Sequence, residues 1–353
     1  MTLRHEALHQ LLRVPPIGAA ARRLFFLPPE ELRLPLTGAR KGTKMPREHP
    51  LKLLVWNIQY AAGRGSFFYD GGRQVSSPRE RVEATLRDIG AAIAAEHPDL
   101  VLLQEVDRGA RRTHDLDEHD ELVHATGLSH HVSAAYHRAR YVPIPRHEPL
   151  GHVDMHLSAM TRFRITGATR YQLPRLNEPV WRRLFNLRRA LLDVRIPLAG
   201  GGELALLNTH LSAFSFGDGT LPAQIAFVKR HLHRLELQGT PWILAGDFNS
   251  LPPGFDRGEL PPRARAYYPE DPSPIAPLFD AFRTPIAAEE LVRRGAGAVG
   301  TYAPAEGVPA DRTLDYVFAG AHVTLLEQRA LHQHLSLSDH APLVVRFQVE
   351  RRA

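Results

Sequence analysis

Five short apolar runs in this chain each adjoin a residue that can bind a metal or move a proton. The runs span residues 53–56, 100–103, 204–207, 242–245 and 343–345. The adjoining polar residues include Asn57, Glu105, Asn208, Asp247 and His340. Apolar runs of this length predict buried strands. Because α/β sheets place their functional residues at strand ends, the pattern predicts an α/β protein with one composite site.

The remaining periodicity predicts helices that cover a sheet and further strands in the middle of the chain. Ser77, Pro78 and Glu80 have the spacing of a capping box with proline at the first helical position, and apolar residues recur at helical spacing after them. Other helices are expected over residues 118–126 and 221–237, and further strands over 156–160, 164–171 and 189–196. The proline-rich segment 251–277 is expected to be a loop.

The motifs are spread along the 353 residues, so dividing the chain would split the site. We therefore predict a catalytic domain over residues 51–349 and an N-terminal extension over residues 1–50. The extension combines short apolar stretches with arginines, which is compatible with peripheral membrane contact through an amphipathic arm. Four prolines keep each helical piece short, and this favours an arm packed on the domain.

Composition narrows the class of partner only slightly. The formal net charge of +6 suits a phosphate-bearing substrate, although the strong preference for arginine over lysine can also reflect genome composition. The absence of cysteine excludes disulfides and thiolate metal sites. No run of 18 apolar residues and no secretory core are present, so the sequence predicts no transmembrane segment and a cytoplasmic location.

Six motifs occur in a fixed order along the chain: NIQY at 57–60, LLQEVD at 102–107, NTHL at 208–211, GDFNS at 246–250, TLDYVF at 313–318 and LSDHAPL at 337–343. Each alone is weak, but the ordered set resembles the endonuclease/exonuclease/phosphatase superfamily, the deoxyribonuclease-like fold. The resemblance covers residues 51 to 347. It implies a four-layer α/β sandwich, in which two stacked mixed β-sheets are flanked by helices.

The acidic and amide residues of these motifs supply oxygen ligands, which suit Mg²⁺ or Mn²⁺ better than zinc. The predicted metal ligands are Glu105, Asn57, Asp339, Asp247, Asn249 and His340. The resemblance implies that Glu105 is the principal metal carboxylate, with Asn57 and Asp339 near it. Asp247 and Asn249 would orient the attacking water or a second metal, and the number of ions stays open.

His340 and His210 are the acid–base candidates, because imidazole titrates near neutral pH. The resemblance implies that Asp315 holds the ring of the catalytic histidine, and we predict His340, His210, Asp247 and Asp315 as the catalytic set. A histidine in the position of His210 contacts phosphate in deoxyribonuclease-, sphingomyelinase-, deadenylase- and inositol-phosphatase-like members. Abasic-site endonucleases carry a different motif there, so abasic-site repair is disfavoured.

Residues that follow the strand ends are the substrate-binding candidates. Arg111, Arg112 and His114 come directly after the strand of Glu105 and either contact phosphate or lie in a solvated loop. Asn208, in the NTHL motif, is the fourth candidate.

Three functions remain open. The first is a Mg-dependent phosphoric ester hydrolase that cleaves a phosphodiester, of a lipid or another small phosphate ester, by water attack at phosphorus. The aromatic segments 67–69 and 214–216 would form an apolar shelf for such a substrate, or would only pack together. The second is a nuclease, which needs a basic groove with stacking aromatic residues. The third is a non-catalytic binding protein, and the intact motifs argue against it.

Overall fold

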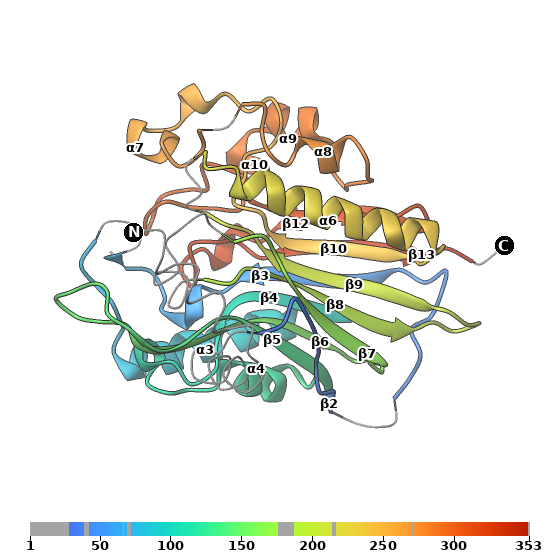
Figure 1. Cartoon of the computed structure of the whole chain (residues 1–353), viewed down its shortest axis with the longest axis horizontal. Coiled ribbons are helices and arrows are strands. Elements are labelled where there is room, and N and C mark those ends of the chain that lie inside the picture. The colour runs from blue at the N-terminus through green and yellow to red at the C-terminus, as the bar shows by residue number, and fades with distance from the viewer. Residues whose placement is uncertain are drawn as a thin grey trace, which may run out of the picture.

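Two β-sheets stack face to face and carry helices on their outer surfaces (Figure 1). The computed structural model describes residues 28–38, 42–65, 67–68, 72–175, 187–213, 217–269 and 271–351. In these parts of the chain one sheet has six strands, in the order β1-β7-β8-β9-β10-β11, and the other has seven, in the order β12-β13-β3-β4-β6-β5-β2. This arrangement confirms the predicted four-layer α/β sandwich.

Each sheet is mostly antiparallel and contains one parallel pair of strands. The six-stranded sheet consists of β1 (Glu31–Arg33), β7 (Gly167–Gln172), β8 (Ala190–Pro197), β9 (Glu203–His210), β10 (Trp242–Asp247) and β11 (Asp315–Ala319). The seven-stranded sheet consists of β2 (Thr37–Gly38), β3 (Leu51–Asn57), β4 (Leu100–Asp107), β5 (His130–Val142), β6 (Gly151–Thr161), β12 (Val323–Ala330) and β13 (Leu343–Val349). The parallel pairs are β9 with β10 and β3 with β4.

Helices cover both outer faces. Helices α3 (Arg79–Ala95) and α4 (Glu118–Thr126) lie on the seven-stranded sheet, and α6 (Thr220–Leu237) lies on the six-stranded sheet (Figure 1). The shorter helices are α7 (Pro262–Arg265), α8 (Ala276–Phe279), α9 (Ala288–Arg294) and α10 (Ala296–Val299). Single 3₁₀ turns span Gln59–Ala61, Arg111–Thr113, Arg257–Glu259 and His332–His334.

The alternation of side chains along each strand divides the core into three apolar layers. In β3, Leu53 and Val55 face the other sheet, whereas Leu54 and Trp56 face helices α3 and α4. The six-stranded sheet likewise turns residues such as Leu207 toward α6. Both sides of each central strand are therefore buried, and this is why the strands read as continuous apolar runs rather than as alternating patterns.

Most predicted elements are present close to their expected positions. The helix over 118–126 is confirmed at both ends, and the helix predicted over 221–237 begins one residue earlier. The predicted capping box is wrong. Pro78 is the N-cap residue of α3 and no side chain caps the helix, because the Ser77 hydroxyl donates to the carbonyl of Ala62 at 2.7 Å.

The predicted domain boundary at residue 51 separates two edge strands from their sheets. Strand β1 pairs with β7, and β2 pairs with β5. Met45 is completely buried in the core between the sheets. Residues 1–27, which carry the predicted membrane-contacting arm, lie outside the described residues. Within the described part of the chain, none of the helices has the length and apolar character needed to cross a membrane.

Candidate active site

The polar residues that follow the central strands meet at one end of the sandwich. The parallel pairs β3/β4 and β9/β10 each direct their carboxyl ends to the same edge, and this edge opens into a cavity of about 440 Å³. Seven of the predicted metal-binding and catalytic residues line it: Asn57, Glu105, His210, Asp247, Asn249, Asp339 and His340.

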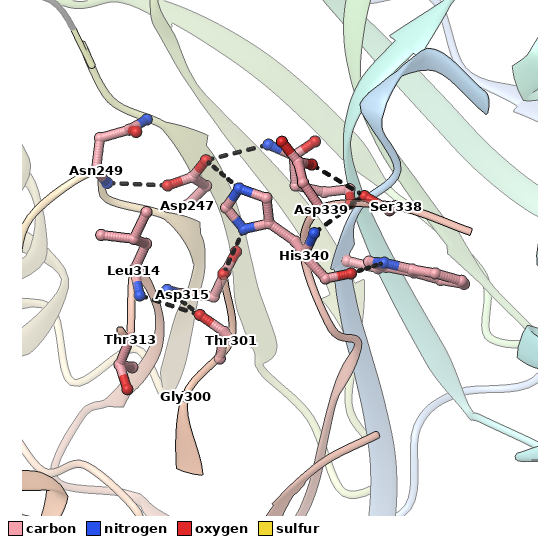
Figure 2. Close-up of polar contacts among 12 residues, drawn as sticks. Asp247, Asn249, Gly300, Thr301, Thr313, Leu314, Asp315, Ser338, Asp339 and His340 are labelled. Atoms are coloured by element: carbon pink, nitrogen blue, oxygen red, sulfur yellow. Dashed lines mark hydrogen bonds and ion pairs between the residues drawn. The ribbon is translucent and has the colours of Figure 1, made fainter. Parts of the chain in front are cut away.

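Asp247 connects the residues that the two sheets contribute to this site. Its Oδ2 accepts a hydrogen bond from Asn57 Nδ2 at 3.1 Å and lies 3.2 Å from Nε2 of His210 and 3.7 Å from Nε2 of His340. Its Oδ1 accepts from the backbone N–H of Asn249 at 2.9 Å (Figure 2). One buried carboxylate therefore contacts side chains from both sheets.

The backbone before Asp247 has a conformation that favours glycine. Gly246 has a φ of +148°, and a Cβ atom at this position would lie 1.9 Å from the backbone oxygen of Thr209 in the neighbouring strand. Any side chain would push β10 away from β9. The glycine of the GDFNS motif thus permits the close strand pairing that places Asp247 beside His210.

A β-bulge aims Glu105 into the cavity. The pairing of β4 with β6 shifts between Leu103 and Val106, and Glu105 has a left-handed φ of 55°. The Tyr136 hydroxyl accepts the backbone N–H of Glu105 at 3.2 Å, and Asn57 Nδ2 lies 3.2 Å from the Glu105 Oε1 atom. Without the bulge, strand alternation would carry this carboxylate to a different face.

His340 is held by hydrogen bonds at its ring and at its backbone. Its Nδ1 lies 2.7 Å from Oδ2 of Asp315, and Trp56 Nε1–H donates to its backbone oxygen at 2.7 Å. The Thr301 hydroxyl accepts the backbone N–H groups of Leu314 and Asp315 and so fixes the start of β11. Figure 2 shows His340 between Asp315 and Asp247, with Nε2 as the ring nitrogen nearer Asp247.

Asp339 is held at the edge of the cavity through its backbone. Its N–H donates to Gln59 Oε1 at 3.3 Å, and the neighbouring Ser338 hydroxyl donates to the backbone oxygen of Asn57 at 2.7 Å. These bonds attach the LSDHAPL segment to the end of β3. The Asp339 carboxylate therefore lies on the same side of the cavity as Asn57.

Burial disfavours the charged forms of the carboxylates in this site. It raises the pKa of Asp247 to about 7; the nearby His340 opposes this rise and Asp315 adds to it. Burial and the carboxylate of Asp339 also raise the pKa of Glu105, against the opposing effect of two arginines. Buried carboxylates with raised pKa values suit a cation as a neighbour, because a cation favours their charged forms.

The two histidines have opposite electrostatic environments. Burial by itself would lower the pKa of His340, but the facing carboxylates of Asp315 and Asp247 outweigh it and raise this pKa well above its usual value. Burial has the largest effect on His210 and lowers its pKa well below the usual value. The charges of Arg189 and His340 lower this pKa further. His340 therefore favours the charged imidazolium and His210 the neutral ring.

The donor set fits a hard divalent cation. Glu105, Asp247 and Asp339 present carboxylate oxygens to one cavity, which suits Mg²⁺ or Mn²⁺. Asp247, Asp315 and His340 also place ligand atoms within 4.8 Å of one another. The 2.7 Å contact of His340 with Asp315 is a hydrogen bond, so Nδ1 of His340 is already engaged.

The amide side chains predicted as metal ligands are oriented as hydrogen-bond donors. Asn57 turns its Nδ2 toward Glu105 and Asp247, while its Oδ1 accepts the backbone N–H of Gln59 at 3.1 Å. Asn249 donates its Nδ2 to the backbone oxygen of Leu211 at 3.1 Å. In this arrangement Asn57 stabilises the two carboxylates that the metal would contact.

Of the three candidates that follow β4, only Arg112 lines the cavity. It is buried and forms an ion pair with Asp107 at 2.7 Å, and its guanidinium lies 3.5 Å from the centre of the Tyr60 ring. Arg111 donates to the backbone oxygen of Pro149, and His114 Nε2 lies 2.8 Å from the backbone oxygen of Ser77. The loop after β4 thus turns Arg111 and His114 away from the site.

Asn208 does not line the cavity either. Its Nδ2 donates to the backbone oxygens of Leu103 and Ser158, and its Oδ1 accepts from Gln104 Nε2 at 2.7 Å. It is fully buried between the sheets. The NTHL motif therefore supplies one residue that ties the sheets together, Asn208, and one that faces the site, His210.

Two residues of the site go beyond the main sequence-based candidates. Tyr136, in the middle of β5, contacts Glu105 and His210. Arg189 lines the cavity, and its buried Nη1 has no hydrogen-bond partner among the described residues. Arg189 is the first residue of a predicted strand and directly precedes β8, which is a weak signal for a phosphate-contacting residue, and no pattern in the sequence marks Tyr136.

The predicted apolar shelf is only partly described. Phe67 is fully buried and packs edge-on against Tyr60 at 6.0 Å between ring centres, whereas Phe68 lines the cavity. Residues 214–216 lie outside the described part of the chain. Phe67 therefore packs within the protein rather than facing a ligand.

Known structures share this architecture. A protein described as an endonuclease/exonuclease/phosphatase from Beutenbergia cavernae is 24% identical, with a TM-score of 0.58 over 86% of this chain and 72% of its own. The human nocturnin catalytic domain, solved with a bound sulfate, is 17% identical and has a TM-score of 0.53. The match covers 87% of this chain and 96% of the nocturnin domain. TDP2 from Caenorhabditis elegans is 15% identical and has a TM-score of 0.51. The match covers 86% of this chain and 75% of the TDP2 chain. These likenesses establish the fold.

No curated protein sequence matches the chain. A sequence model described as the Endonuclease/Exonuclease/phosphatase family matches residues 54–340, a range that contains all the carboxylates and histidines of the cavity described above. The chain therefore belongs to the endonuclease/exonuclease/phosphatase family.

Proposed function

We propose that this protein hydrolyses phosphodiesters with the help of Mg²⁺ or Mn²⁺. One observation carries the proposal: three carboxylates, the Asp315-bound His340 and Arg189 line the same cavity, and Nη1 of Arg189 has no hydrogen-bond partner in the described part of the chain. Carboxylates suit the metal, and a guanidinium suits the phosphate. The sulfate bound to the nocturnin catalytic domain supports anion binding within this fold.

Each group has a distinct part in the proposed reaction. Glu105, Asp247 and Asp339 would hold the ion, which when bound polarises the phosphoryl oxygen and offsets its charge. Arg189 would bind a non-bridging oxygen of the phosphate through Nη1–H, for which the described residues offer no acceptor. His340 would exchange a proton at Nε2, since Asp315 engages Nδ1 and fixes the orientation of the ring.

Chelation tests this proposal. With bis(p-nitrophenyl) phosphate as the probe, we expect turnover to fall by at least about 10²-fold in EDTA and to return with Mg²⁺ or Mn²⁺. Glu105→Gln should require more metal for half-maximal rate while the thermal unfolding curve without metal stays close to wild type. Turnover that is unchanged by EDTA would exclude the metal-dependent reaction.

The cavity also supports a substrate that carries an apolar group. The apolar residues on one of its walls come mainly from strands β5 and β6 and their connection: Val142, Ile144, Leu150 and Met155. The segment around α7 adds the rings of Tyr267 and Tyr268. We infer that the substrate is a small phosphate ester with an apolar moiety, such as a lipid phosphodiester, rather than a nucleic acid.

The apolar wall gives a second prediction. Ile144 lines the cavity and is 56% exposed, so Ile144→Ser should fold normally and lower kcat/KM for a short-chain lipid phosphodiester by about threefold to tenfold through lost apolar contact. Leu326→Ser, at an aliphatic residue of β12 that is 47% exposed, is the matched control and should have no effect.

Salt dependence separates the two substrate classes. Cleavage of the lipid phosphodiester should change little between low and moderate salt, whereas nucleic-acid binding falls steeply as several phosphates release counterions together. Faster cleavage of plasmid DNA than of every lipid ester, with an equal rate for Ile144→Ser, would show that the protein is a nuclease.

A further inference from the structure

The hydrogen bonds around Tyr136 determine which nitrogen of His210 carries the proton. The Tyr136 side chain is only 1% exposed, and its hydroxyl oxygen has two polar neighbours among the described residues. The backbone N–H of Glu105 donates to this oxygen at 3.2 Å. The hydroxyl hydrogen is then left for the second neighbour, Nδ1 of His210 at 3.1 Å. Nδ1 therefore accepts, and the ring proton is on Nε2.

The other side of the ring requires the same assignment. Nε2 of His210 lies 3.2 Å from Oδ2 of Asp247, and in its charged form, which a bound cation favours, this carboxylate only accepts hydrogen bonds. With the proton on Nδ1 instead, the Nε2 lone pair would face this carboxylate. The Tyr136 hydroxyl hydrogen would then have no acceptor among the described residues. Two independent contacts therefore select the Nε2–H tautomer.

We propose that Tyr136 is a positioning residue that fixes His210 as the Nε2–H tautomer, so that His210 acts as a fixed hydrogen-bond donor and not as a proton carrier. The proposal rests on the phosphodiester hydrolysis proposed above. In that reaction Nε2–H donates to Asp247 or to a non-bridging phosphate oxygen. No proton leaves His210, and the proton exchange is confined to His340.

The assignment explains why the site holds two histidines with different partners. His340 has the Asp315 carboxylate at Nδ1, which stabilises an imidazolium and lets the ring take up and release a proton. His210 has a phenol at the same ring position, and a phenol that donates to Nδ1 stabilises only the neutral ring. The partner at Nδ1 thus gives each histidine a different part in the reaction.

Glutamine substitution distinguishes a donor from a proton carrier. A glutamine amide places an N–H near the position of Nε2 but does not exchange protons near neutral pH. With bis(p-nitrophenyl) phosphate and Mg²⁺, His210→Gln should stay within about tenfold of wild-type turnover, while His210→Ala should lose about 10²–10³-fold. His340→Gln should be as inactive as His340→Ala. Equal losses for His210→Gln and His210→Ala, with both proteins folded by circular dichroism, would overturn the proposal.

A spectroscopic measurement tests the tautomer without relying on activity. In protein labelled with ¹⁵N-histidine, and with His210 assigned by comparison with His210→Gln, Nε2 should resonate as the protonated nitrogen and Nδ1 as the unprotonated one. Tyr136→Phe should shift the Nδ1 signal and lower kcat by about 10- to 100-fold. Protonated Nδ1 in the wild-type protein would refute the tautomer, whatever the substrate proves to be.

Tyr171→Phe is the matched control for this substitution. It removes the hydroxyl of another tyrosine whose ring lies 4.7 Å from a histidine ring, that of His231, outside the cavity. The His210 signals and the turnover of this variant should match wild type. If the wild-type spectrum shows Nε2–H but the probe is not hydrolysed, the tautomer stands and the proposed phosphodiester hydrolysis fails.

Discussion

His340→Ala is expected to lower turnover of bis(p-nitrophenyl) phosphate by about 10²–10⁴-fold, the usual effect of removing a positioned proton-transfer group. The ring is almost fully buried, Asp315 holds its Nδ1 at 2.7 Å, and its Nε2 faces Asp247 in the cavity. Asp315→Asn should give a smaller loss, because the ring stays in place while the bond that orients it is weakened. Steady-state kinetics at saturating Mg²⁺ measure both effects.

The chain offers a matched control for this pair. Nε2 of His231 in α6 lies 3.0 Å from Oδ2 of Asp193 in β8, and both residues are buried outside the cavity. His231→Ala also removes a buried histidine from an aspartate, so its turnover per folded molecule should equal that of wild type. Wild-type turnover by His340→Ala would show that another group moves the proton.

Gly246→Ala is expected to destabilise the fold by on the order of 3–5 kcal/mol, since it combines backbone strain with a steric clash. The added Cβ would lie 1.9 Å from the Thr209 backbone oxygen, and neither central strand can move without disturbing the core on both sides of its sheet. The midpoint of urea unfolding should fall accordingly, and the protein that remains folded should lose turnover as Asp247 shifts.

Gly297→Ala is the control for the same chemical change. Gly297 lies in α10, and among the described residues no atom beyond its chain neighbours and its own helix backbone lies within 4 Å of the position that its Cβ would occupy. Alanine should leave stability unchanged or raise it by about 0.5–1 kcal/mol, because glycine costs more backbone entropy in a helix. If Gly246→Ala and wild type unfold at the same urea concentration, β9 and β10 do not approach each other closely enough for a Cβ at residue 246 to clash.

The sequence by itself determined the positions of the central strands along the chain, and the resemblance of its motifs to a known superfamily gave the architecture. Runs such as 53–56 and 242–245 are apolar at every position because both faces of these strands are covered, and such runs identify central strands without any knowledge of their neighbours. The motifs at their ends identified the residues, proposed here to bind a metal and to transfer protons, that line the cavity. The polarity of a residue and its position beside a strand are local properties, so they are readable from the chain alone.

Only the tertiary structure decided which polar residues face the cavity and which serve the core. Asn208 and His210 lie two residues apart in β9, yet Asn208 ties the sheets together and His210 reaches the site. Arg112 is paired with Asp107 within the protein, while Tyr136 enters the site from β5. These outcomes depend on hydrogen bonds between residues distant in sequence and on the bulge at Glu105, and neither leaves a local pattern in the chain.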